Sequence, residues 1–298
     1  MCRRMTLPTA GRPAVTLLEL LAVVAILGVL FGLTASAVQA ARGAAARIGC
    51  ANNLRQLTLA SQHHHDALGV LPPGLSYPFD PRIPVGWPVA LLPFLDQQPL
   101  WQATVAAYRA DPFGWANPPH VGLSTVVPEF ACPADGRVRQ PITDPGGTTA
   151  AYLSYAGVGG GRRWTGGVVV GGRTFRLTDV TDGTSQTFLF GERPPWGEWY
   201  IGNWYNQSGP FEGPLGFGWS ISLPTHNTWQ GGSCQGPYVY GPGRVDNPCD
   251  TFHFWSLHPG GANWAFCDGS VRFLPYSARP LTVPLATRAG GEVVVLPD

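Results

Sequence analysis

The sequence predicts an α+β protein in which a long N-terminal helix packs on an antiparallel β-sheet head with long loops rich in glycine and proline. Three observations lead to this prediction. Leu20–Val38 is a run of nineteen uncharged, mostly aliphatic residues near the N-terminus. Beyond it, apolar residues recur at three- and four-residue intervals, which is the helical period. The 298 residues include 39 Gly and 30 Pro, and only 12% are charged, a composition that favours a turn-rich β structure.

The apolar run has the length of a membrane span. At about 1.5 Å per residue, a helix over Leu20–Val38 nearly crosses the roughly 30 Å hydrocarbon core of a bilayer. Glu19 lies at its upstream edge, where a carboxylate is costly unless a partner neutralises it. Within the run, Gly28 and Gly32 form a small-xxx-small step that lets two helices approach closely. Glycines are also common in membrane helices without such a contact, so both interpretations stay open.

The helix is expected to continue past the apolar run, from about Val15 to about Asp66. The stripe that supports this continuation consists of Val38, Ala41, Ala45, Ile48, Ala51, Leu54 and Leu57. Its second half would pack against the sheet. These boundaries divide the chain into a leader at 1–14, a transmembrane part at 15–38, an amphipathic part at 39–68 and a head at 69–298.

The first elements of the head follow from spacing and turn signals. Trp87–Trp101 has helical spacing, with a core set of Leu91, Leu92, Leu95 and Leu100. A hairpin is expected over 167–177, and a strand at Thr187–Gly191 follows an Asp-Gly turn.

The clearest hairpin joins Asn263–Cys267 to Ser270–Leu274 through Asp268-Gly269, with Trp264 and Phe266 on one face. Residues 194–248 are rich in aromatic residues, Gly and Pro and lack helical period. They are expected to form a long excursion on the sheet.

The junction between Ala14 and Val15 is a candidate processing site. Cleavage there would leave a free amine four residues before Glu19, and a neighbouring copy could present that amine to the carboxylate. An ordinary secretory signal is the alternative, with three arginines as its charged region and Ala35–Ala37 as its cleavage site. The mature chain would begin at Val15 in the first case and at Val38 in the second.

The stretch Ala14-Val15-Thr16-Leu17-Leu18-Glu19 resembles the N-terminal segment of type IV prepilins and type II secretion pseudopilins, although Ala14 and Val15 replace the usual Gly and Phe. In those families the leader is removed just before an aromatic or apolar residue followed by Thr-Leu-x-Glu. Further motifs, collinear over nearly the whole chain, are similar to those of prepilin-like proteins that carry a domain of unknown function. They include Ala51–Leu57, His63–Asp66, Leu91–Gln98, Cys132–Asp135, Asp182–Thr187, His258–Asn263 and Asp268–Phe273.

This resemblance implies an architecture and an assembly role, without a substrate. A leader peptidase that also methylates would act at the junction, and Thr16 and Glu19, with the Gly28 and Gly32 step, would serve assembly with copies of the chain or other pseudopilins. The protein would be a single-pass component of a bacterial inner membrane, in a pilus or a secretion system. Its N-terminus would be cytoplasmic and its head periplasmic or, after assembly, at the cell surface.

Five of the six cysteines lie beyond the predicted span, where an oxidising compartment would favour pairing. Cys234 and Cys249 bracket a Gly/Pro-rich loop and are the first candidate bridge. Cys50 and Cys132 are the second, which leaves Cys267 over. Spacing alone does not fix the connectivity.

Metal sites compete with simpler interpretations. Adjacent histidines on a helix point in different directions, so His63–Asp66 is expected to be a solvated helix end. The resemblance to pseudopilins suggests calcium at the Asp-Gly turns of Asp182 or Asp268; the alternative is that these are hairpin turns without a metal. No other cofactor is expected. A mixed set near the last hairpin is the remaining candidate, although its spacing matches no zinc signature: Cys249, His253, His258, Cys267 and Asp268.

The sequence also excludes several function classes. Without any Lys, the chain has neither a Walker-type phosphate loop nor a Schiff-base amine, and a net charge of +1 gives no strong attraction to nucleic acid. It contains no Gly-x-Ser-x-Gly or His-Glu-x-x-His motif, so a non-enzymatic subunit is expected.

Two alternatives come from other classes. One is a secreted metal-dependent enzyme. The other is an anchored module that never polymerises and binds glycans through a group of aromatic residues, which could equally form a local core. That group comprises Trp196, Trp199, Tyr200, Trp204, Tyr205, Trp219 and Trp229.

Overall fold

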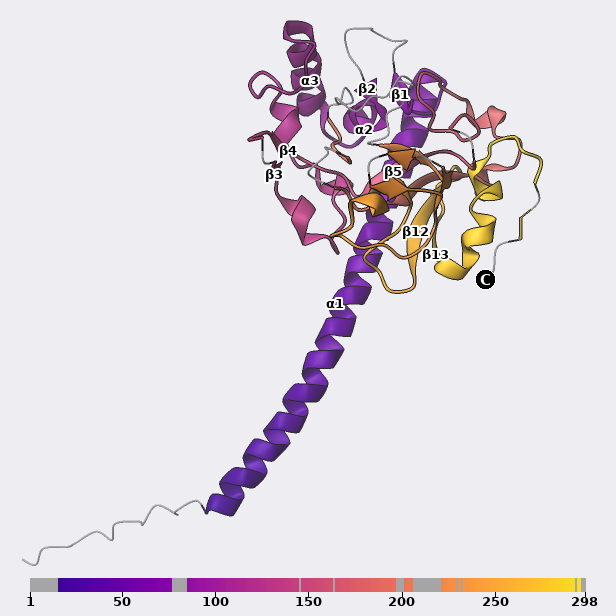
Figure 1. The fold of residues 1–298 in the computed structure, drawn as a ribbon. Helices are drawn as coiled ribbons and strands as arrows, with labels where there is room; N and C mark the ends of the chain where they lie inside the picture. Colours follow the sequence, from indigo (N-terminus) through magenta and orange to yellow (C-terminus); the bar gives the residue numbers. More distant parts are fainter. Residues whose placement is uncertain are drawn as a thin grey trace, which may run out of the picture. The chain divides into compact units, whose positions relative to one another are not determined.

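A single helix, α1 (Leu17–Leu68), contributes to both units into which the chain divides after Ala45 (Figure 1). Its limits lie within two residues of those predicted. The structure is a computed structural model that describes residues 16–76, 85–144, 146–162, 164–196, 201–205, 221–228, 230–231, 233–292 and 294–295. The two units are considered separately below.

The described part of the first unit is the apolar half of α1. Its side chains from Thr16 to Ala45 are exposed, and an 18-residue window of α1 has a mean hydropathy of 2.5. The hydroxyls of Thr34 and Ser36 donate to the helix carbonyls of Leu30 and Leu33 at 2.8 and 2.9 Å. Because these hydroxyls bond to backbone of their own helix, this half of α1 suits a hydrocarbon environment.

The second half of α1 buries one face in the head. That face consists of Cys50, Leu54, Leu57, Thr58, Ala60, Ser61 and His64. Ile48 is 60% exposed, whereas Leu54 and Leu57 are buried, so only the later members of the predicted stripe lie on the buried face. Two bonds join this helix to the sheet region: the Tyr155 hydroxyl donates to the Cys50 carbonyl, and the Gln62 amide to that of Cys267.

Short helices follow α1. The segment predicted as helical over 87–101 contains α2 (Trp87–Leu91), the 3₁₀ turn η1 (Leu92–Phe94) and the start of α3 (Gln98–Ala110). Leu91, Leu92 and Leu95 are buried, and Leu100 is partly buried, as predicted. Pro93 and Pro99 stand at helix starts, where the missing N–H costs little. Further 3₁₀ turns are η2 (Val121–Ser124), η3 (Pro128–Phe130), η4 (Gly136–Arg139), η5 (Leu177–Asp179), η6 (Thr184–Gln186), η8 (Pro248–Phe252), η9 (Tyr276–Leu281) and η10 (Pro284–Ala286).

The main sheet has five strands in the order β13-β12-β6-β5-β7. All neighbours are antiparallel except β5 and β7, which are parallel, so the sheet is mixed rather than purely antiparallel. The strands are β5 (Tyr155–Gly160), β6 (Phe188–Glu192), β7 (Ser222–Pro224), β12 (Gly261–Phe266) and β13 (Val271–Pro275). Within the described residues, two-residue strands form four small ribbons: β1 (Leu75–Ser76) with β2 (Val85–Gly86), β3 (Ile142–Thr143) with β4 (Thr149–Ala150), β8 (His226–Asn227) with β11 (Tyr238–Val239), and β9 (Gln230–Gly231) with β10 (Cys234–Gln235).

Buried side chains form two clusters, and β12 contributes to both. Ala265 and the following Cys267 pack with α1 and α2, whereas Trp264 and Phe266 pack with the C-terminal 3₁₀ turns. This is the alternation predicted for the last hairpin, whose register pairs Ala265 with Val271. The α+β fold class is thereby confirmed.

One predicted element of the head is wrong, and another is incomplete. Residues 167–177 form no hairpin: Val168, Val169 and Val170 are buried in an irregular segment whose amides bond to β5. Gly157 explains the arrangement, because a Cβ there would lie 2.3 Å from the Val169 side chain. The excursion over 194–248 also contains β7, an edge strand of the main sheet.

The histidine run at the end of α1 is only partly solvated. His63 is exposed, but His64 is buried, with Nδ1 2.8 Å from the Val70 carbonyl and its ring against Phe94. Outside the run, His120 is likewise buried, between the Tyr205 hydroxyl at 2.8 Å and the Asp111 carbonyl at 3.0 Å. Burial lowers the pKa of both imidazoles, and the carbonyl contacts only partly offset it.

These two histidines predict an acid-sensitive head. As the pH is lowered through about 6.5, the unfolded chain takes up protons on both imidazoles before the folded chain does. The free energy of unfolding therefore decreases as the pH is lowered. The slope contributed is at most about 1.4 kcal/mol per pH unit for each histidine. Urea unfolding between pH 7.5 and 5.5 measures it. The double variant His64→Gln/His120→Gln should flatten the profile and the exposed control His63→Gln should not; an unflattened profile in the double variant contradicts the explanation.

Candidate functional site

The N-terminal candidate residues form a helix cap. The Thr16 amide and hydroxyl each donate to Oε2 of Glu19 at 2.9 Å, and the Glu19 amide donates to Oγ1 of Thr16 at 3.3 Å. This reciprocal pair is a capping box, which the Thr-x-x-Glu spacing signals and which adds to the charge role predicted for Glu19. A Cβ at Gly28 or Gly32 would meet nothing within 4 Å, so the proposed small-residue step has no neighbour in the described part of the chain.

The structure joins the cysteines in the two pairs predicted. Cys50 bonds to Cys132 across 82 residues, and Cys234 bonds to Cys249 across 15. Cys267 is the free one among the described cysteines and is fully buried. Burial, with the Asp268 carboxylate adding to it, raises the pKa of the Cys267 thiol well above its usual range, so it lacks the thiolate character of a nucleophile or metal ligand.

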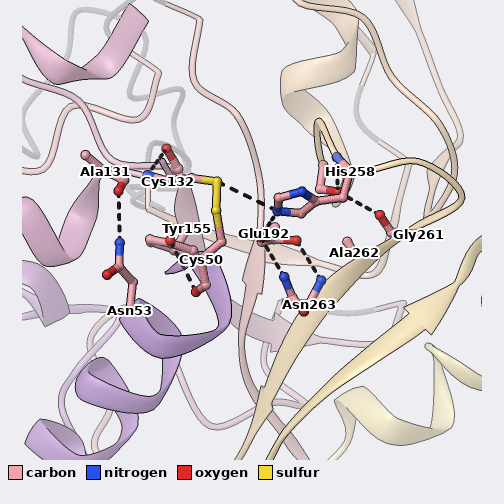
Figure 2. A network of polar contacts seen from close by, with 12 residues as sticks. Cys50, Asn53, Ala131, Cys132, Tyr155, Glu192, His258, Gly261, Ala262 and Asn263 are labelled. Atoms are coloured by element: carbon pink, nitrogen blue, oxygen red, sulfur yellow. Dashed lines mark hydrogen bonds and ion pairs between the residues drawn. A yellow bond between two sulfur atoms is a disulfide. The ribbon is translucent and has the colours of Figure 1, made fainter. Parts of the chain in front are cut away.

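A buried polar cluster surrounds the first disulfide (Figure 2). Nε2 of His258 lies 3.9 Å from Sγ of Cys132 and 3.1 Å from Oε1 of Glu192. All four side chains of this cluster, Cys50, Cys132, Glu192 and His258, are buried. Among the residues that the structure describes, they are the one group of metal-ligating types that converges, with ligand atoms within 4.8 Å of one another.

Asn263 fixes the Glu192 carboxylate. Its amide N–H donates to Oε2 at 2.6 Å and its side-chain Nδ2 donates to Oε1 at 3.1 Å, as Figure 2 shows. The carboxylate is thereby bonded on both oxygens before any ligand arrives. The sequence prediction gave Glu192 and Asn263 no role in a site, although Asn263 ends one of the motifs that resemble the prepilin-like family. The signal was a lone carboxylate closing the otherwise apolar strand Phe188–Glu192.

The predicted mixed metal set does not come together. Cys249 is in a disulfide, and His253 pairs with Asp250 at 3.1 Å rather than with His258. Asp268 accepts from the Ser270 amide within its turn, which is the bare hairpin interpretation. Of the predicted set, His258 alone joins the converging group.

Asp182 binds protein donors. Its carboxylate accepts from the Thr287 hydroxyl at 3.0 Å, the Gly290 amide at 2.7 Å and the Gly291 amide at 2.9 Å. These donors present hydrogens to the oxygens that calcium would need. The contact ties the C-terminal segment to the turn before β6.

The aromatic candidates divide between core and undescribed residues. Trp204 and Tyr205 are fully buried, and their rings pack against each other and against Phe130 and Tyr108. Trp196 is partly buried. These described members favour the local-core interpretation over a glycan surface. The positions outside the described residues are Trp199, Tyr200, Trp219 and Trp229, and also the processing residues Ala14 and Val15.

Comparison with known proteins gives one family. No curated protein and no solved structure matches the chain. The family model described as a protein of unknown function (DUF1559) matches residues 39–280, which begins after the apolar run and covers the second half of α1, the main sheet and the buried cluster. The chain therefore belongs to the DUF1559 family.

Proposed function

We propose that this chain is a non-enzymatic, prepilin-like subunit that is anchored in a membrane by α1 and assembles with copies of itself or related subunits. The observation that carries the proposal is the continuity of α1 from Leu17 to Leu68. Its first half is apolar and exposed, and its second half is built into the head. A secretory signal cut after Ala37 would remove the first part of this helix. A leader cut before Val15 would keep the helix whole.

In this proposal Glu19 has a role beyond the cap. Its carboxylate lies at the start of an apolar helix, where an unneutralised charge is costly in lipid. Thr16 supplies hydrogen bonds but no positive charge. The new amine of Val15 in a neighbouring subunit would supply that charge, and would set the register between two helices.

Two substitutions separate the charge from the cap. Glu19→Ala removes both, whereas Glu19→Gln keeps an acceptor for the Thr16 amide and removes the charge. We expect both variants to remain in the membrane fraction with a mature N-terminus at Val15. We also expect both to lose crosslinked oligomers by about tenfold or more, because removing one partner of a desolvated ion pair costs more than the 1.4 kcal/mol that equals a factor of ten.

The control is Glu292→Gln, a charge loss at an exposed carboxylate of the head. It should leave crosslinking unchanged. Loss of oligomers in the alanine variant alone would attribute the effect to the helix cap and reject the ion pair. A wild-type chain that begins at Val38 would reject the proposed function itself.

A further inference from the structure

The cluster around Cys50 and Cys132 brings together four ligand-type groups from four separate parts of the chain. Cys50 is in α1, Cys132 follows η3, Glu192 ends β6 and His258 precedes β12. The distances already measured from Nε2 of His258, 3.1 Å to Oε1 of Glu192 and 3.9 Å to Sγ of Cys132, place these atoms around one point. Figure 2 shows the imidazole pointing at the sulfur and the carboxylate together.

Zinc binds each of these donor types. Two thiolates, an imidazole nitrogen and a carboxylate oxygen complete a tetrahedral, closed site. Zinc bonds of about 2.0 to 2.3 Å at tetrahedral angles place ligand atoms about 3.3 to 3.8 Å apart. The imidazole contacts are already close to this spacing. The two sulfur atoms, which are bonded to each other in the disulfide, would have to separate.

The surroundings hold the ligands as an outer shell would. Asn263 bonds both oxygens of Glu192, and the Cys132 amide donates to the Ser154 hydroxyl at 3.0 Å. The Tyr155 hydroxyl donates to the carbonyl of Cys50 at 3.4 Å. Such contacts orient metal ligands, and the N–H groups on Glu192 also stabilise the negative charge that two thiolates and a carboxylate bring.

We propose that this position binds one Zn²⁺ whenever Cys50 and Cys132 are thiols, and that the ion and the disulfide are alternative occupants. On binding, each thiol releases one proton and each sulfur forms one bond to zinc, while Nε2 of His258 and Oε1 of Glu192 supply the other two. Oxidation releases the ion. The disulfide of an oxidoreductase accepts two electrons from the two thiolates and two protons from water and becomes a dithiol, the S–S bond between Cys50 and Cys132 forms, the two S–Zn bonds break, and Zn²⁺ leaves.

The test uses the full-length chain in detergent. A phosphine reductant cleaves both disulfides, taking oxygen from water to become the phosphine oxide, and the protein is then loaded with Zn²⁺ and desalted anaerobically. Metal analysis should find about one zinc per reduced chain and no stoichiometric zinc on the oxidised chain. Cobalt in place of zinc should give the absorption of a tetrahedral site with thiolate ligands.

Matched variants locate the ion. Cys50→Ser/Cys132→Ser should abolish zinc binding, whereas Cys234→Ser/Cys249→Ser, which removes the other disulfide, should retain it. Glu192→Gln and His258→Gln should each weaken binding by about tenfold or more. Zinc on the Cys50→Ser/Cys132→Ser variant, or none on the reduced wild type, overturns the proposal.

A second measurement shows whether the reduced chain is still folded. Near-ultraviolet circular dichroism of the reduced chain is recorded before and after zinc. A signal that is retained, or that zinc restores together with stoichiometric uptake, supports the site. A signal that stays lost with no zinc bound overturns it.

Discussion

Replacing both Cys50 and Cys132 by alanine is expected to lower the free energy of unfolding of the oxidised chain by about 4.5 kcal/mol, because the bond closes an 82-residue loop. The corresponding Cys234→Ala/Cys249→Ala variant opens a loop of 15 residues and should lose only about 3 kcal/mol. Both values follow from the entropy that a crosslink removes from the unfolded chain. Urea titration of the detergent-solubilised variants measures the difference.

The wild-type chain provides the control for cavity effects. Oxidised and reduced wild type differ in the crosslinks and hardly in side-chain volume, so their difference reports the crosslinks themselves. Under reductant and a metal chelator, the two double variants should therefore approach the reduced wild type. Equal losses from both pairs in the oxidised chain would contradict the loop-length argument.

Trp87→Ala is expected to cost about 3 to 5 kcal/mol of unfolding free energy, the range for deleting a large buried ring. Trp87 is fully buried, and its ring centroid lies 4.5 Å from that of Phe190 and 5.9 Å from that of Phe130. Its indole Nε1 donates to the Ile221 carbonyl at 2.9 Å, which ties the start of α2 to the residue before β7.

Trp87→Phe separates packing from the hydrogen bond. It keeps a ring between Phe190 and Phe130 and removes the donor. The Ile221 carbonyl still accepts from the Gly157 amide at 2.7 Å, so the loss of one of its two hydrogen bonds should cost about 0.5 to 1.5 kcal/mol. Denaturant unfolding of both variants measures the two losses. A phenylalanine variant as unstable as the alanine variant would mean that the bond to Ile221, rather than ring packing, accounts for the effect.

The elements that could be predicted from the sequence are those whose determinants are local. The apolar composition of Leu20–Val38 predicts a helix, and Asp268-Gly269 between alternating apolar residues predicts a hairpin. The Thr16 and Glu19 cap was equally local and readable, three residues apart, but its carboxylate was interpreted only through charge.

The elements that could not be predicted depend on distant partners. Val168 and Val169 have the composition of a strand, but Gly157 admits the Val169 side chain and they fill space beside β5 instead. β7 is three residues long and pairs in parallel with β5, so no hairpin-turn motif in the sequence predicts it. Glu192 and Asn263 are 71 residues apart, and no spacing rule links them to Cys50.

If the chain is anchored by α1 as proposed, the bond between Cys50 and Cys132 has a mechanical consequence. A pull on the N-terminal end of α1 would otherwise be resisted at the head by side-chain packing and by hydrogen bonds such as those from Tyr155 and Gln62, which break when the helix is peeled away. With the disulfide formed, the force is transmitted through the two sulfur atoms to the segment after Phe130, and Cys50 stays attached to that segment even after the neighbouring noncovalent contacts have broken.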